Sequence, residues 1–157
     1  MMQRTGLALL AALACLPGAA NSQEALASEY GYKLAGKTEG ATYFLSGIRR
    51  GAEPDSVEAW IWTMLPEPTG AGSEVHDAVA QRSVLRCEGR SIEALKTENY
   101  LNGALTGAAD IPPQTPINVR NTPMEAAWKV ACDTGVRYSV ETVADLSAAY
   151  AIARKPG

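Results

Sequence analysis

The 157-residue chain is poor in the residues on which catalytic and metal sites depend. Its single histidine, His76, lies in a segment rich in Gly, Ser and Glu, whereas a protein metal site needs several such ligands. Any Ser-His-Asp hydrolase would have to use that same histidine, and no G-x-S-x-G turn accompanies it. No glycine-rich run follows a strand and opens a helix, as phosphate-binding loops require. These shortages predict a protein that is not an enzyme and that uses no cofactor and no metal.

Charge is also too evenly mixed to indicate a nucleic-acid partner. The chain has a net charge of −3, which becomes −4 if Arg4 is removed with a leader segment, and this argues against nucleic acid or an anionic membrane surface as the main partner. Two carboxylate pairs, Glu53/Asp55 and Glu93/Glu98, are of the kind that any acidic surface carries. They are weak candidates for general acid–base catalysis.

Long hydrophobic runs are absent except at the N-terminus. Arg4 precedes an apolar run from Leu7 to Leu16, and small residues follow up to Ser22, which is the pattern of a secretory signal peptide. We expect cleavage after Ser22, with Ala20 as the alternative, so that residues 1–22 are the signal and 23–157 are one domain. The expected location is the periplasm, the cell surface or the extracellular medium, without a transmembrane segment.

Only three cysteines are present, and one of them falls within the expected signal. The order Ala12-Leu13-Ala14-Cys15 differs from a lipoprotein signal, which has a Leu-like residue three positions before its cysteine, so we do not expect Cys15 to carry a lipid. The mature chain then keeps Cys87 and Cys132. Two cysteines in a small exported domain are typical of a disulfide.

The middle of the chain reads as a series of strands. A strand is expected over Ala41–Ser46, and Val57–Leu65 gives the strongest strand signal. One face of the second carries Trp60, Trp62 and Met64, and the other face is aliphatic, so this strand should be central and covered on both sides. Residues 81–101 predict two strands joined by a turn at Glu88-Gly89, and a further strand is expected over Ile117–Asn121. The alternation places Ser83, Leu85 and Cys87 on one face and the neighbouring arginines on the other.

Two helices are expected after this sheet. The first has Thr122 as N-cap, Pro123 at the first helical position and Glu125 completing a capping box; Gly135 ends it. Met124, Trp128 and Cys132 form its apolar stripe. A disulfide from Cys132 to Cys87 would join this helix to the sheet, with a structural role. A second helix is expected from about Ser139 to Arg154.

Two features indicate a binding surface. Trp60 and Trp62 are either core residues under the C-terminal helix, or part of a homodimer seam or ligand face, because aromatic residues concentrate at binding hot spots. Arg82, Arg86 and Arg90, with Lys96 across the hairpin, form a basic strip on an acidic protein. This strip either meets an acidic partner or a glycan, or is a solvated strand face balanced by Glu88, Glu93 and Glu98.

The order of these parts resembles the bacterial surface-adhesin E-like domain family. The matching segments are "AWIWTMLPEP", "RSVLRCEGRSIEALKTENY" and "NTPMEAAWKVACD", within residues 41–133. The resemblance implies an α+β fold, in which an antiparallel sheet of about five or six strands has one helix tethered by the cysteine pair. It also implies non-catalytic, adhesin-like binding of host, extracellular matrix or serum proteins. The helical segment from Val136 to Pro156 lies beyond the shared pattern.

The alternative function is a periplasmic accessory or inhibitor-type module that binds a bacterial protein. Under either reading the sequence predicts a protein partner. The oligomeric state, monomer or homodimer, stays open at this stage.

Overall fold

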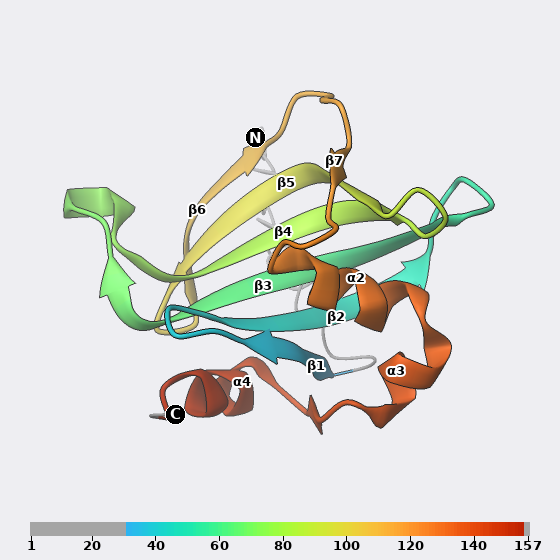
Figure 1. Cartoon of the computed structure of the whole chain (residues 1–157). Coiled ribbons are helices and arrows are strands. Elements are labelled where there is room, and N and C mark those ends of the chain that lie inside the picture. The colour runs from blue at the N-terminus through green and yellow to red at the C-terminus, as the bar shows by residue number, and fades with distance from the viewer. Residues whose placement is uncertain (1–30, 156–157) are drawn as a thin grey trace, which may run out of the picture.

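A computed structural model describes residues 31–155 and shows an α+β fold, mostly antiparallel sheet (Figure 1). The expected signal peptide and Cys15 lie outside the described residues. None of the described helices is long and apolar enough to cross a membrane. The elements, in chain order, are β1 (Tyr32–Lys37), β2 (Thr42–Arg50), β3 (Ser56–Thr69), the 3-10 turn η1 (Gly72–Glu74), β4 (His76–Arg86), β5 (Ser91–Leu101), β6 (Ala104–Asp110), β7 (Ile117–Asn118), α2 (Met124–Cys132), α3 (Thr134–Ser139), β8 (Thr142–Val143) and α4 (Leu146–Ala153).

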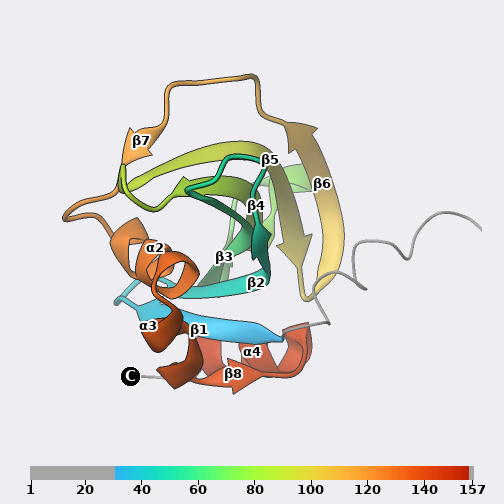
Figure 2. The same ribbon diagram turned by 90° about the vertical axis from the view of Figure 1, so that its right-hand side faces the viewer.

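The sheet is an antiparallel meander in which each of the first six strands pairs with the next. Its order is β6-β5-β4-β3-β2-β1-β8, and β7 pairs with β5 beyond the end of β6. Figure 2 shows that the sheet is strongly curled, with α4 beneath β1. The curl brings the β5–β6 turn to α4, where Gly103 lies against Leu146 and Tyr150.

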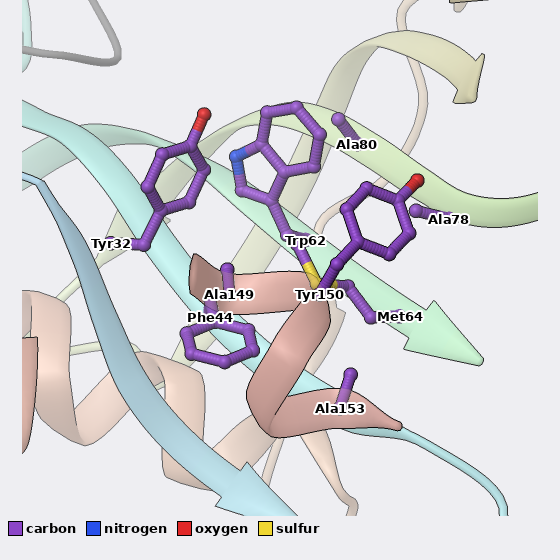
Figure 3. Close-up of a cluster of buried hydrophobic side chains, with 9 residues drawn as sticks. All are labelled: Tyr32, Phe44, Trp62, Met64, Ala78, Ala80, Ala149, Tyr150 and Ala153. Carbon is purple, nitrogen blue, oxygen red and sulfur yellow. The ribbon is translucent and has the colours of Figure 1, made fainter. Parts of the chain in front are cut away.

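Strand β3 supplies side chains to two separate cores because both of its faces are apolar. Trp62 and Met64 belong to one core, together with Phe44 of β2 and the residues of α4 (Figure 3). Ala59 and Ile61 belong to the other core. We call the two sides of the sheet the α4 face and the α2 face, after the helix that covers each. The predicted central position of this strand is confirmed, and a helix packs against each of its two faces.

On the α4 face, small and aromatic side chains alternate. Ala78 and Ala80 of β4 are fully buried and leave room for Trp62 and for Tyr150 of α4 (Figure 3). The indole N–H of Trp62 donates to the Ser46 hydroxyl at 2.9 Å, which satisfies the polar atom of this buried ring.

On the α2 face, Leu45, Ile61 and Leu85 pack against one side of α2. This side consists of Ala127, Val130 and Ala131, all nearly inaccessible to solvent. Alanines allow the helix to approach the sheet closely, so the aliphatic side chains of the strands fill the space between them.

The sheet has more strands than the five or six predicted, because β1, β6 and β8 were not expected. Strand β1 has a polar, glycine-containing sequence, and β8 is only two residues long. The signal for β6 was present: Asn102-Gly103 joins β5 to β6, and both residues have positive φ (50° and 81°), as a type I′ hairpin turn requires.

The predicted C-terminal helix is present, but it is shorter than the predicted range from about Ser139 to Arg154. The segment instead forms the end of α3, the short strand β8 and the helix α4. The apolar residues of this segment belong to different elements. Val143 lies in β8 and pairs with Tyr32 of β1, whereas Tyr150 lies in α4 and packs in the core with Trp62. Asp145 starts α4 by accepting a hydrogen bond from the Ala148 N–H at 2.8 Å.

The ends of α2 also differ from the prediction. The Thr122 hydroxyl donates to the Val119 carbonyl instead of capping the helix, while Glu125 does reach back, to the Asn121 N–H at 2.9 Å. At the other end Asp133, and not Gly135, stops the helix. Its carboxylate accepts from the Gly135 N–H at 2.9 Å and thereby begins α3.

Cys87 and Cys132 form the predicted disulfide, with their Cα atoms 5.4 Å apart. It joins the turn after β4 to the last residue of α2. A second contact reinforces this end of the helix, because the Trp128 indole N–H donates to the Arg86 carbonyl at 3.1 Å.

We expect Cys132→Ala to lower the free energy of unfolding by about 4 kcal/mol, because the disulfide closes a loop with a sequence separation of 45 residues. Urea unfolding of the variant and of oxidised wild type measures the difference. Reduced wild type is the control and should match the variant. Equal unfolding midpoints for the variant and the oxidised protein would contradict the prediction.

Candidate binding surface

Helix α4 is fastened to the sheet by a buried carboxylate. Asp77 of β4 is fully inaccessible and accepts hydrogen bonds from the Tyr150 hydroxyl at 2.7 Å and the Arg154 guanidinium at 2.8 Å. The backbone N–H of Asn102 donates to both of its oxygens, at 3.1 and 3.0 Å. We call these four residues the Asp77 cluster. Buried charge is tolerated here because it is paired and hydrogen-bonded from several sides.

Beyond α4, no other described helix covers the same face of the sheet, and we call this part the uncovered surface. The strand registers align a row of side chains on this face: Ser46, which is itself buried, lies opposite Trp60, Trp60 opposite Arg82, Arg82 opposite Lys96, and Lys96 opposite Asp110. Trp60 is partly buried and packs against the core on this face. Opposed cross-strand residues lie about 5 Å apart at their Cβ atoms, so Trp60 and Arg82 are direct neighbours.

Arg82 is the member of the predicted basic strip whose charge is available. It is exposed, and it makes no hydrogen bond or ion pair with another residue of the described part of the chain. Lys96, the next residue along the row, is 2.8 Å from Glu98 and is compensated by it.

Arg86 and Arg90 are engaged within the protein. Arg86 binds Glu53 and Glu93, each at 3.1 Å, and these hydrogen bonds raise its pKa. Arg90 lies over the ring of Trp128 at 5.1 Å from its centroid and is 3.7 Å from Glu125. Of the three predicted arginines, two therefore serve internal contacts, which fits the balanced strand face that the acidic neighbours suggested.

The two tryptophans of the predicted binding surface lie in different environments. Trp62 is only 4% exposed and lies in the core beneath α4, between the rings of Tyr32 and Tyr100 at centroid distances of 5.4 and 5.0 Å. Trp60 is the one of the pair beside the uncovered surface. The structure thus brings Trp60 and Arg82 together and places Trp62 in a packing position.

Sequence reasoning treated Glu98 as a surface carboxylate and did not single out Tyr100, but the structure buries the Glu98 side chain on this face. Glu98 is 2% exposed and accepts a hydrogen bond from the Tyr100 hydroxyl at 2.8 Å. Burial raises the pKa of Tyr100, and the bond to Glu98 raises it further. Burial likewise raises the pKa of Tyr150, with the bond to Asp77 second. The alternation of Lys96, Glu98 and Tyr100 along β5 was the signal that could have identified this cluster.

The weaker candidates have local roles. His76 Nδ1 lies 2.8 Å from the Glu74 carbonyl oxygen at the start of β4. Of the carboxylate pairs, Glu53 and Glu93 bind Arg86, and Asp55 accepts from the Glu88 N–H at 2.7 Å. Within residues 31–155, no group of His, Cys, Asp and Glu side chains has a metal-binding arrangement.

Comparisons with known proteins add no relative to this description: no family model, no curated protein and no solved structure matches the chain.

The tyrosine contacts predict a late step in the alkaline titration. Because the folded protein holds the pKa of Tyr100 and Tyr150 above the ordinary value of about 10, these phenols should ionise only at a pH well above it. The unfolded chain releases the protons first, so stability is complete below pH about 10 and falls as the pH rises above it. Ultraviolet absorbance of phenolate and urea unfolding at several pH values measure both effects.

Tyr100→Phe and Tyr150→Phe should each remove part of the late step and flatten the alkaline loss of stability. Tyr138→Phe, at an exposed position outside these contacts, is the matched control and should leave the late step unchanged. A late step of full amplitude in both Tyr100→Phe and Tyr150→Phe would contradict this prediction.

Proposed function

We propose that this chain is a non-catalytic, exported protein that binds another protein through the surface around Trp60 and Arg82. The observation that carries the proposal is the adjacency of a partly buried tryptophan and an exposed arginine with no partner in the described chain. Tryptophan and arginine are two of the residue types that dominate the binding energy of protein interfaces. Both residues lie on strands of the sheet, so their backbone is already ordered before binding.

The charge of the surface indicates what Arg82 would meet. Arg82 is a local cation on a chain with a net charge of −3, and Trp60 beside it offers a flat apolar ring. A carboxylate of the partner, placed next to an apolar side chain, would complement both. A single available arginine fits one acidic side chain better than a polyanion.

Export is supported by the disulfide. Structural disulfides form and persist in oxidising compartments, which agrees with the signal-like N-terminal sequence. Two kinds of partner follow from two locations. On the cell surface the protein would act like an adhesin and bind host, matrix or serum proteins, as the resemblance to the surface-adhesin E-like family suggests. In the periplasm it would be an accessory or inhibitor-type module for a bacterial protein.

Substitution of the two surface residues tests the proposed site. Trp60→Ala and Arg82→Ala should each weaken binding to a captured partner at least tenfold, as loss of a hot-spot residue does. Binding of the purified mature protein to immobilised matrix and serum proteins, and to proteins of a periplasmic extract, supplies the measurement. Tyr138→Ala and Arg120→Ala are matched controls, since both remove exposed side chains elsewhere. Equal binding by all four variants would refute the site.

Protease treatment of intact cells that carry a C-terminally tagged chain distinguishes the two locations. Loss of the tag from intact cells supports the adhesin-like function. Protection of the tag until the outer membrane is opened supports the periplasmic one, and retention in the cytoplasm would exclude both.

A further inference from the structure

Strand β6 ends the sheet opposite β8 and has an unusual edge. Its sequence, Ala-Leu-Thr-Gly-Ala-Ala-Asp, has one charged residue and neither lysine nor proline. Among the described elements it contacts β5 and the turn η1. Leu105 is 53% exposed, one of the few large apolar side chains that are so open to solvent. Edge strands usually carry charges or proline because their unpaired backbone groups otherwise attract another strand.

The backbone groups of β6 that face outward can be identified from the ladder. The Ile111 N–H donates to the Leu95 carbonyl at 2.9 Å, and Lys96 lies opposite Asp110. Because directly opposed residues of an antiparallel pair alternate between bonded and unbonded, Ala109 faces β5, while the N–H and C=O groups of Ala108 and Asp110 point away from it. No described segment pairs with this outer side.

The usable edge is short. A register shift separates the pairings of Asn99 and Tyr100, which places an irregularity next to Gly107, and proline follows at position 112. Residues 107–111 therefore offer a regular edge about 17 Å long. Such a length fits one extended peptide. A stable dimer buries about 800 Å² per partner, more than strand pairing of this length supplies.

The edge also has a charge preference. Asp110 is exposed and forms no ion pair, because the ammonium group of Lys96 opposite it is 2.8 Å from Glu98. The small residues Gly107, Ala108 and Ala109 leave space on both faces for the side chains of an added strand. A lysine or arginine of that strand would complement Asp110.

We propose that residues 107–111 bind an extended, basic segment of the protein partner by adding it as a strand beside β6. The proposal rests on the proposed function, since it specifies how a protein partner is recognised. Backbone hydrogen bonds from Ala108 and Asp110 supply the pairing, and Asp110 selects the charge.

Phage display of short unstructured peptides on the purified, oxidised mature protein tests the proposal. Selected peptides should carry Lys or Arg, and binding of the synthesised peptides is measured by fluorescence anisotropy. Ala108→Pro removes an outward N–H without removing a bond to β5, and it should weaken binding at least tenfold. Ala108→Val keeps the N–H and should bind as wild type does. Asp110→Lys should bind acidic peptides instead of basic ones. If Ala108→Pro lowers the melting temperature, the Asp110→Lys variant tests the proposal in its place.

Failure to select any peptide, selection without charge preference, or equal binding by the Asp110→Lys variant would overturn the proposal. Loss of self-association in Ala108→Pro, seen by sedimentation without any peptide binding, would overturn it in favour of a second copy of the chain. Tyr138→Ala, which removes an exposed side chain elsewhere, should leave peptide binding unchanged. If Trp60→Ala and Arg82→Ala spare partner binding while Ala108→Pro abolishes it, the Trp60 surface fails and the edge stands.

Discussion

The structure depends on the two apolar faces of β3. A strand with Trp62 and Met64 on one side and Ala59 and Ile61 on the other cannot leave either side in water, so the sheet needs a cover on both. The two covers, α2 and α4, come from the segment that follows the meander, and each requires its own attachment.

The two attachments use different chemistry. Helix α2 is joined covalently at its last residue, and its alanine face fits closely against Leu45 and Leu85. Helix α4 is short, and its alanines bury little area, so the Asp77 cluster adds charged hydrogen bonds from its C-terminal turn. Within residues 31–155, α4 is the only helix on its face, and the row from Trp60 to Asp110 lies beyond it. The extent of the cover thus defines the surface available to a partner.

The sequence predicted the parts that depend on local alternation and missed those that depend on distant contacts. The faces of β3 and β4, the disulfide and the helix around Trp128 followed from spacing and residue type. Strands β1 and β8 could not be recognised, because β1 is specified by pairing with β2 and β8 by pairing with β1, and not by their own composition. Single-residue roles on the surface were equally inaccessible: Arg82, Arg86 and Arg90 look alike in the sequence, and only the positions of Glu53, Glu93 and Trp128 distinguish them.

The position of α4 along the chain has a consequence for the order of assembly. Ala149, Tyr150 and Ala153 complete the core around Trp62, and they belong to a helix that follows every strand of the sheet along the chain. A chain that is synthesised or translocated from its N-terminus therefore keeps this aromatic core open until α4 has emerged. A chain interrupted before α4 would present Trp62 to chaperones and proteases.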